Sequence, residues 1–100
     1  MLFFVLGGTP LNSLAAEKNV FVKLDFFSIE CIKKRKRSSC QRALALSEQL
    51  QRQAAAAGIY SCQSRLLGLG ADLVMTSFKF ERSGSALALL REVKKFCSSL

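Results

Sequence analysis

The chain has 100 residues, half of them hydrophobic, and fifteen Lys and Arg against seven Asp and Glu give it a formal net charge of +8. This length allows one small domain of marginal stability, and the apolar content excludes a solvated, disordered tail. The positive charge favours anionic partners, whether acidic proteins, anionic lipid or nucleic acid, without selecting one of them.

The N-terminal segment resembles a secretory signal peptide. An apolar run over residues 2–6 is followed by Ser13 and Ala15, the small residues that signal peptidase requires before its cleavage site. The apolar run is short and no basic residue precedes it, so a first strand or helix of the core is the alternative. We expect residues 1–16 to be a signal peptide and residues 17–100 to form one small helical domain. No apolar stretch approaches the ~18 residues of a membrane span, so the sequence predicts no transmembrane helix.

The next segment fits two periodicities. Apolar residues alternate with others along residues 20–27, as they do in a strand, but apolar residues fall on both sides of that pattern. Leu24, Phe27 and Cys31 recur at spacings of three and four, as on one face of a helix. We favour a short helix over residues 24–34.

A second helix is predicted after the basic residues. Ser38 or Ser39 can cap its first turn, because a serine oxygen accepts from backbone N–H groups that are otherwise free. Gly58 can adopt the left-handed conformation that ends helices. Between these signals, apolar residues recur on one stripe: Ala43, Leu46, Leu50, Ala54 and Ala57.

Two more helices complete the chain. Ser61 is the expected cap of the first, whose main apolar stripe consists of Leu67, Ala71, Val74 and Phe78, with a second strip at Leu66, Leu69 and Leu73. Gly68 and Gly70 weaken this helix and are expected to permit the close approach of a neighbour. The last helix is expected to begin near Ser85, with Ala86, Leu90, Val93 and Cys97 on its apolar side.

Residues 84–96, GSALALLREVKKF, resemble the second helix of a tetratricopeptide-type repeat, but nothing recurs at the 34-residue period of such repeats. The sequence therefore indicates no family. It predicts an all-α fold, a small antiparallel array of three to four helices of the helical-hairpin type, stapled by disulfides.

The four cysteines are the candidates for those disulfides. Their spacings lack the short separations of zinc ligands, and the chain has no histidine, so we expect no metal site. Antiparallel helices would bring Cys31 and Cys40 to one end of the bundle and Cys62 and Cys97 to the other end. We therefore predict those two pairs. Lasting disulfides require an oxidising space, so we expect a secreted or periplasmic protein, with a cytoplasmic or nuclear location as the alternative.

The segment CIKKRKRSSC encloses five consecutive cations between two of these cysteines: Lys33, Lys34, Arg35, Lys36 and Arg37. Such a run fits a nuclear import signal or a nucleic-acid patch as well as a solvated loop between helices. No aromatic residue interleaves the run, whereas nucleic-acid binding sites usually add aromatic side chains that stack on bases. We therefore favour an acidic protein or an anionic surface over nucleic acid as the partner.

The sequence offers little for catalysis. A serine or cysteine nucleophile would lack histidine as its usual base, and the Gly-x-Gly motif that ends at Gly70 has leucine where a dinucleotide site needs a third glycine. We expect no enzyme activity and no cofactor. Asp72 is the acid that falls in the most apolar helix, so its carboxylate must be either exposed or paired, and Arg65 or Lys79 would be the simplest partner.

These observations favour an exported, non-enzymatic helical domain that interacts with an acidic partner or surface. One alternative is an intracellular basic protein that binds nucleic acid or importin through Lys33–Arg37. Another is a reading frame under weak functional selection, whose helices have no specific partner.

Overall fold

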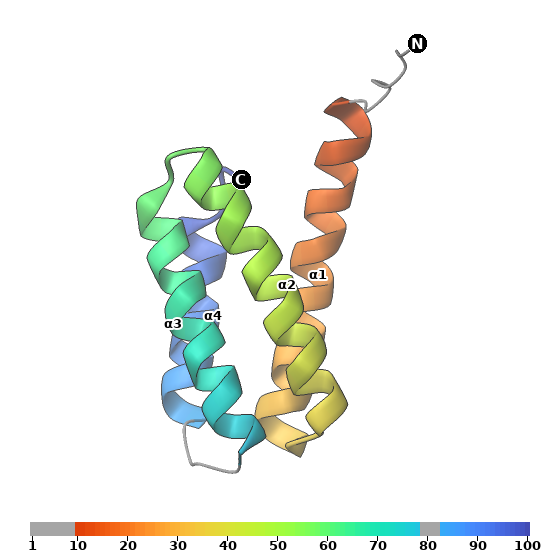
Figure 1. Ribbon diagram of the computed structural model, residues 1–100, viewed down its shortest axis with the longest axis vertical. Coiled ribbons are helices and arrows are strands. Elements are labelled where there is room, and N and C mark those ends of the chain that lie inside the picture. The colour runs from red at the N-terminus through yellow and green to blue at the C-terminus, as the bar shows by residue number, and fades with distance from the viewer. Residues whose placement is uncertain (1–9, 79–82) are drawn as a thin grey trace.

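A computed structural model describes the backbone of residues 10–78 and 83–100, and the side chains of residues 19–78 and 84–100. Within these ranges the chain forms four α helices and no strand: α1 (Pro10–Lys34), α2 (Arg37–Ala56), α3 (Tyr60–Ser77) and α4 (Ser83–Phe96). Neighbouring helices run antiparallel, and the N-terminal part of α1 diverges from α2 and begins beyond the ends of the other three helices (Figure 1). The all-α, disulfide-stapled array predicted from the sequence is confirmed. Most of the expected signal peptide, including its apolar run, lies outside the described residues.

Helix α1 is much longer than predicted, because it begins at Pro10 instead of Leu24. Proline suits the first position of a helix, where its missing N–H would have no partner within the helix. The strand interpretation of residues 20–27 is wrong, because these residues lie within α1. Two apolar residues of the alternating pattern, Val22 and Phe26, are 68% and 55% exposed. The buried side of α1 instead follows helical spacing, at Val20, Leu24, Ser28, Cys31 and Ile32.

The predicted serine caps are wrong for both α2 and α3. Helix α2 begins at Arg37, and neither its N-cap residue Lys36 nor Ile59, the N-cap residue of α3, makes a side-chain cap hydrogen bond within the described residues. Ser61 lies inside the first turn of α3, where its carbonyl oxygen accepts from the hydroxyl of Ser64. Ser39 is buried and bonds across to α1 instead.

The predicted end of α2 is confirmed. Gly58 has φ of +75°, the left-handed conformation that glycine adopts without a steric penalty. Its N–H donates to the carbonyl of Ala55 at 3.1 Å, and the N–H of Ile59 donates to the carbonyl of Ala54 at 2.9 Å. This pair of bonds is a Schellman motif, which satisfies carbonyl groups left free at the helix end.

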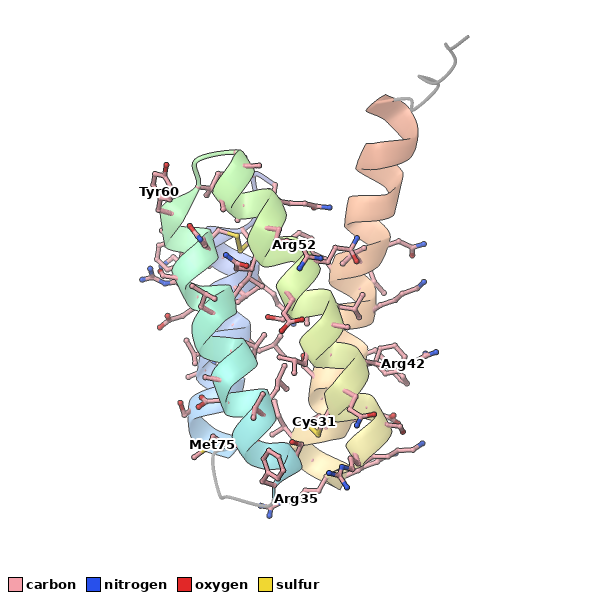
Figure 2. The ribbon with its side chains drawn as sticks, viewed as in Figure 1. Cys31, Arg35, Arg42, Arg52, Tyr60 and Met75 are labelled. Carbon is pink, nitrogen blue, oxygen red and sulfur yellow. A yellow bond between two sulfur atoms is a disulfide. The ribbon has the colours of Figure 1, made fainter. Side chains whose placement is uncertain are left out.

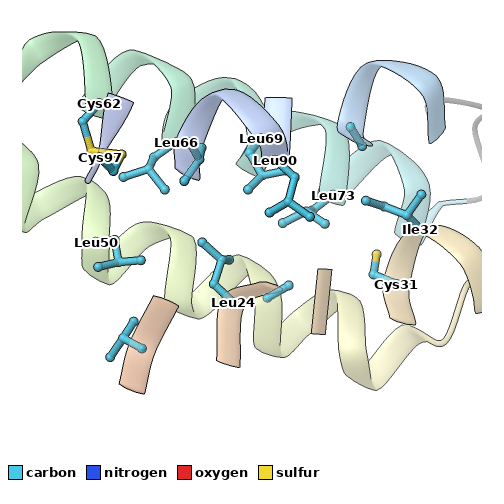
Figure 3. Close-up of a cluster of buried hydrophobic side chains, with 14 of the residues drawn as sticks. Leu24, Cys31, Ile32, Leu50, Cys62, Leu66, Leu69, Leu73, Leu90 and Cys97 are labelled. Carbon is cyan, nitrogen blue, oxygen red and sulfur yellow. A yellow bond between two sulfur atoms is a disulfide. The ribbon is translucent and has the colours of Figure 1, made fainter. Parts of the chain in front are cut away.

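Helix α3 buries the second of its two predicted apolar strips, and this corrects the assignment of the main stripe to the core. Leu66, Leu69 and Leu73 are at most 1% exposed and lie in the centre of the core (Figure 3). By contrast, Leu67 and Phe78 of the other stripe are 56% and 61% exposed. The stripe is real, but it faces away from the core.

Small and polar residues set how closely the helices approach α3. A Cβ atom on Gly68 would lie 3.3 Å from Cδ1 of Leu89 on α4, so glycine permits the close approach that the sequence predicts. On the opposite side, the buried hydroxyl of Ser47 on α2 donates to the carbonyl of Leu66 at 2.9 Å. Helix α3 is thereby held between α2 and α4.

Two disulfides close the ends of the array in the predicted pairing. Cys31 joins Cys40 with a Cα–Cα distance of 4.6 Å, and Cys62 joins Cys97 with a distance of 4.8 Å. The core leucines lie between the two bonds (Figure 3). Each bond connects the end of one helix to the end or start of another, so the bundle is stapled at both ends.

Candidate interaction site

The five cations form the turn between α1 and α2, which we call the basic turn (Lys33–Arg37). Two of its residues end α1, two form the link, and Arg37 begins α2. The chain reverses direction within this link because Arg35 adopts φ of +54°, which is uncommon for a residue other than glycine. The N–H of Arg35 still donates to the carbonyl of Cys31 at 2.9 Å and so completes the last turn of α1.

Exposed charge lies directly above a buried disulfide. Each of the five cations is exposed, whereas Cys31 and Cys40 beneath them are 0% and 2% exposed. Figure 2 shows Cys31 at the same end of the molecule as Arg35, which is at the tip of the turn. The disulfide and the two flanking helices together fix the turn, so its charges project from a defined backbone.

A carboxylate and a hydroxyl support the turn from one side. Glu30 accepts from the hydroxyl of Ser39 at 2.9 Å through Oε1, and its Oε2 lies 3.7 Å from Nζ of Lys34. The Ser39 hydrogen bond and the charges of Lys36 and Lys34 lower the pKa of Glu30, although partial burial opposes them. Glu30 is therefore ionised at neutral pH, and it ties the end of α1 to the start of α2.

The two helix ends at the basic turn carry opposite partial charges. Lys33 and Lys34 occupy the last turn of α1, where cations interact favourably with the negative end of the helix dipole. The first turn of α2 carries the positive end of its own dipole and contains no acidic residue. The negative end of the α1 dipole lies at the same turn and offsets the positive end of α2, so an anion that approached this end would meet chiefly the side-chain cations.

Asp72 is paired, but Arg65, one of its two expected partners, is not the residue that it contacts. Its side chain is buried and accepts from the hydroxyl of Ser85 on α4 at 2.5 Å. Arg65 lies elsewhere, with Nε 3.3 Å from Oε1 of Glu92 and its guanidinium 4.0 Å from the centre of the Phe96 ring. Lys79, the other expected partner, lies outside the described residues. Asp72 thus helps to hold α4 against α3.

The described residues contain no group of three or more His, Cys, Asp or Glu side chains placed to hold a metal ion. All four cysteines are used in the disulfides. None of the described helices combines the length and the hydrophobicity needed to span a membrane.

Two features of the structure do not follow from the sequence. The sequence does not predict the Ser39–Glu30 bond, because Ser39 also fits the pattern of a helix cap and no short-range pattern marks a hydrogen bond between residues nine apart. The exposed stripe of α3 was visible in the sequence as an apolar repeat, but periodicity alone does not tell which of two apolar strips faces the core.

Comparison with known proteins yields no further assignment: no protein-family model, no curated protein and no solved structure matches this chain.

Proposed function

We propose that this protein is an exported, non-enzymatic helical domain that binds an acidic protein or an anionic surface through its basic turn. The observation that carries the proposal is the placement of five exposed cations on a turn closed by a buried disulfide. A loop that only needs to be solvated would not require a disulfide to hold its backbone. A turn whose backbone is already ordered loses less conformational entropy when it binds a partner.

The electrostatics favour a carboxylate-rich or phosphate-rich partner. Exposed cations on a protein surface attract anions over a Debye length of ~10 Å at 0.1 M salt. A single exposed ion pair contributes little free energy, whereas five neighbouring cations can attract the same anionic partner together. No base-stacking aromatic side chain lies within Lys33–Arg37. This absence favours an acidic polypeptide or an anionic surface over nucleic acid.

Export is supported by two independent features, the N-terminal sequence pattern and the two cysteine pairs at bonding distance. We expect the mature chain to begin near Ala16 or Glu17. N-terminal sequencing of the native product tests this expectation, and alkylation before peptide mapping reports the thiol state. An intact Met1 together with four free thiols would contradict export.

The binding proposal is tested with a variant in which all five residues of the basic turn are replaced by glutamine. These side chains are exposed, so the variant should fold like the wild type by circular dichroism. Both proteins are offered poly-glutamate, anionic vesicles, duplex DNA and RNA in competition at physiological salt. We expect the wild type to retain poly-glutamate or the vesicles, with an affinity that falls as the salt concentration rises. The affinity of the glutamine variant for the same probe should be at least tenfold lower.

The competition also separates the alternatives. Selective retention of DNA or RNA by the wild type would favour the intracellular, nucleic-acid-binding interpretation. Equal behaviour of the two proteins toward all four probes would leave the basic turn without a binding role and contradict the proposal.

A further inference from the structure

A shallow apolar groove lies between α2 and α3, on the side of α3 that faces away from the core. The hollow has a volume of about 230 Å³. Leu44 of α2 forms one wall, and Leu67, Ala71 and Val74 of α3 form the other. Gly70 also lines the groove, and a Cβ atom there would make an ordinary contact with Leu44 at 3.4 Å.

The α3 wall of the groove has the spacing of a helix-packing seam. Leu67, Ala71 and Val74 of this wall follow one another at intervals of four and three residues, which is the heptad pattern that partner helices use. Phe78, the C-cap residue of α3, continues the same spacing beyond the groove. The stripe covers about three helical turns, or ~16 Å along the axis. Leu67 and Phe78 are more than half exposed. An apolar surface of this kind on a small protein usually marks an interaction site.

The groove leads into the basic turn. Arg37 lies seven residues before Leu44, so the two residues share one face of α2 about 10 Å apart. Glu48 stands in the α2 wall beside the apolar hollow, eleven residues or ~16 Å beyond Arg37, and makes no ion pair with any described residue. From one end to the other the groove therefore presents positive charge, an apolar seam, and then a single carboxylate.

From this order of charges and apolar contacts we infer the form of the acidic partner, an inference that rests on the proposed function of the basic turn. The groove between α2 and α3 binds an amphipathic helix of the partner protein. The apolar face of that helix packs along Leu67, Ala71 and Val74, its acidic end reaches Lys33–Arg37, and a lysine or arginine about three turns away meets Glu48.

Each part of the surface contributes a different property to this mode of binding. The apolar seam supplies most of the affinity, as anchors at intervals of three and four residues do in other helix-in-groove complexes. The basic turn sets the direction in which the helix lies and speeds association, because complementary charges act mainly on orientation and on-rate. Glu48 rejects helices that carry a carboxylate at the matching position.

Three fluorescein-labelled peptides test the inference by fluorescence anisotropy at physiological salt. The first is a 21-residue helical peptide with leucines at heptad spacing, four glutamates at one end and one lysine eleven positions from them. The second has the same composition in scrambled order. The third carries the four glutamates in a glycine–serine chain without an apolar face. We expect the first peptide to bind the full-length, oxidised protein at least tenfold more tightly than either of the others.

A variant of the groove and a matched control locate the binding. The L67Q/A71Q double variant replaces two exposed residues of the groove. Its affinity for the first peptide should be at least tenfold lower than that of the wild type, and its weak binding of the third peptide should be unchanged. The control, V22Q/F26Q, removes two apolar side chains of similar exposure from the outer face of α1 and should change neither affinity. Circular dichroism confirms that both variants fold.

The outcomes separate this inference from the proposed function. The inference about the groove would be overturned if all three peptides bound with equal affinity and lost that affinity only when the basic turn was replaced by glutamine. The basic turn would then remain as the binding site. No binding of any peptide would overturn both. Concentration-dependent dimerisation that L67Q/A71Q abolishes would also overturn the inference, because a second copy would then cover the groove.

Discussion

The two ends of the bundle are closed by the same kind of bond but differ in almost everything else. Cys31 and Cys40 are nine residues apart and close a single turn, whereas Cys62 and Cys97 are 35 residues apart and join α3 to the last turn of the chain. Five exposed cations lie on the first end. The second end is formed by the α2–α3 turn and the C-terminal residues, where most side chains are uncharged, and Lys94 and Lys95 in the last turn of α4 are the cations nearest to it.

This difference indicates a division of roles between the ends. A long ring removes more freedom from the unfolded chain than a short one, so Cys62–Cys97 contributes more to stability in the loop-entropy model. The short ring restricts a segment that is already local in sequence, and its main effect is to fix the basic turn. One disulfide therefore mainly holds the fold together, and the other mainly shapes a surface.

The largest expected effect comes from removing the long-range bond. The C62A/C97A variant should lose about 4 kcal/mol of unfolding free energy, a large part of the total for a domain of this size. Urea denaturation followed by circular dichroism measures the loss. Affinity for poly-glutamate should stay within twofold of wild type under conditions where the variant is folded.

Removing the short-range bond should reverse this pattern. The C31A/C40A variant should lose about 3 kcal/mol of unfolding free energy, less than the first variant. Its affinity for poly-glutamate should fall severalfold, because the basic turn then samples more conformations before it binds. A larger loss of stability in C31A/C40A than in C62A/C97A, with unchanged affinity, would contradict the division of roles.

The helix that joins the two ends offers a smaller test. Replacing Gly70 with alanine should raise the free energy of unfolding by up to ~1 kcal/mol, since glycine is a poor helix former and a Cβ atom there makes an ordinary contact with Leu44. Gly68→Ala should raise the free energy of unfolding by less, because its Cβ atom would lie 3.3 Å from Leu89, a tighter contact to which the Leu89 side chain must adjust. Thermal denaturation ranks the two variants, and the reverse order would show that Leu44 yields less readily than Leu89.

The smallest expected effect is a pH dependence at the basic-turn end. Because the pKa of Glu30 is lowered below its usual 4.5 in the folded protein, its ionised form stabilises the fold above that pH. This stabilisation is lost as the pH falls through the lowered value. The difference in stability between wild type and Ser39→Ala should therefore be present at pH 7 and shrink below pH 4.5. A difference that grows on acidification would contradict the assigned role of Ser39.

The sequence predicts much of this fold because its signals are local. Gly58 ends α2 as expected, and the cysteine pairs follow from antiparallel topology alone. The errors arise where two local signals compete. Ser39 is both a good cap and a good hydrogen-bond donor to a neighbouring helix, and the tertiary contact with Glu30 prevails.

The candidate site was predictable only in part, for a related reason. The basic residues are identified by composition, and their exposure follows from their charge. The groove beside them depends on which strip of α3 the other helices cover. Leu67 and Leu66 are adjacent in sequence and equally apolar, so only the packing of α2 and α4 decides that Leu66 is buried and Leu67 exposed.

The measurement that tests the account most directly is an NMR titration of the ¹⁵N-labelled protein with poly-glutamate. If the basic turn is the binding end, amide shifts should concentrate at Lys33–Arg37 and in the first turn of α2. Residues 57–60 and the C-terminal residues, at the other end, should stay unchanged even though Lys94 and Lys95 lie near that end. Shifts centred on Lys94 and Lys95, or spread evenly over all lysines and arginines, would contradict the central claim.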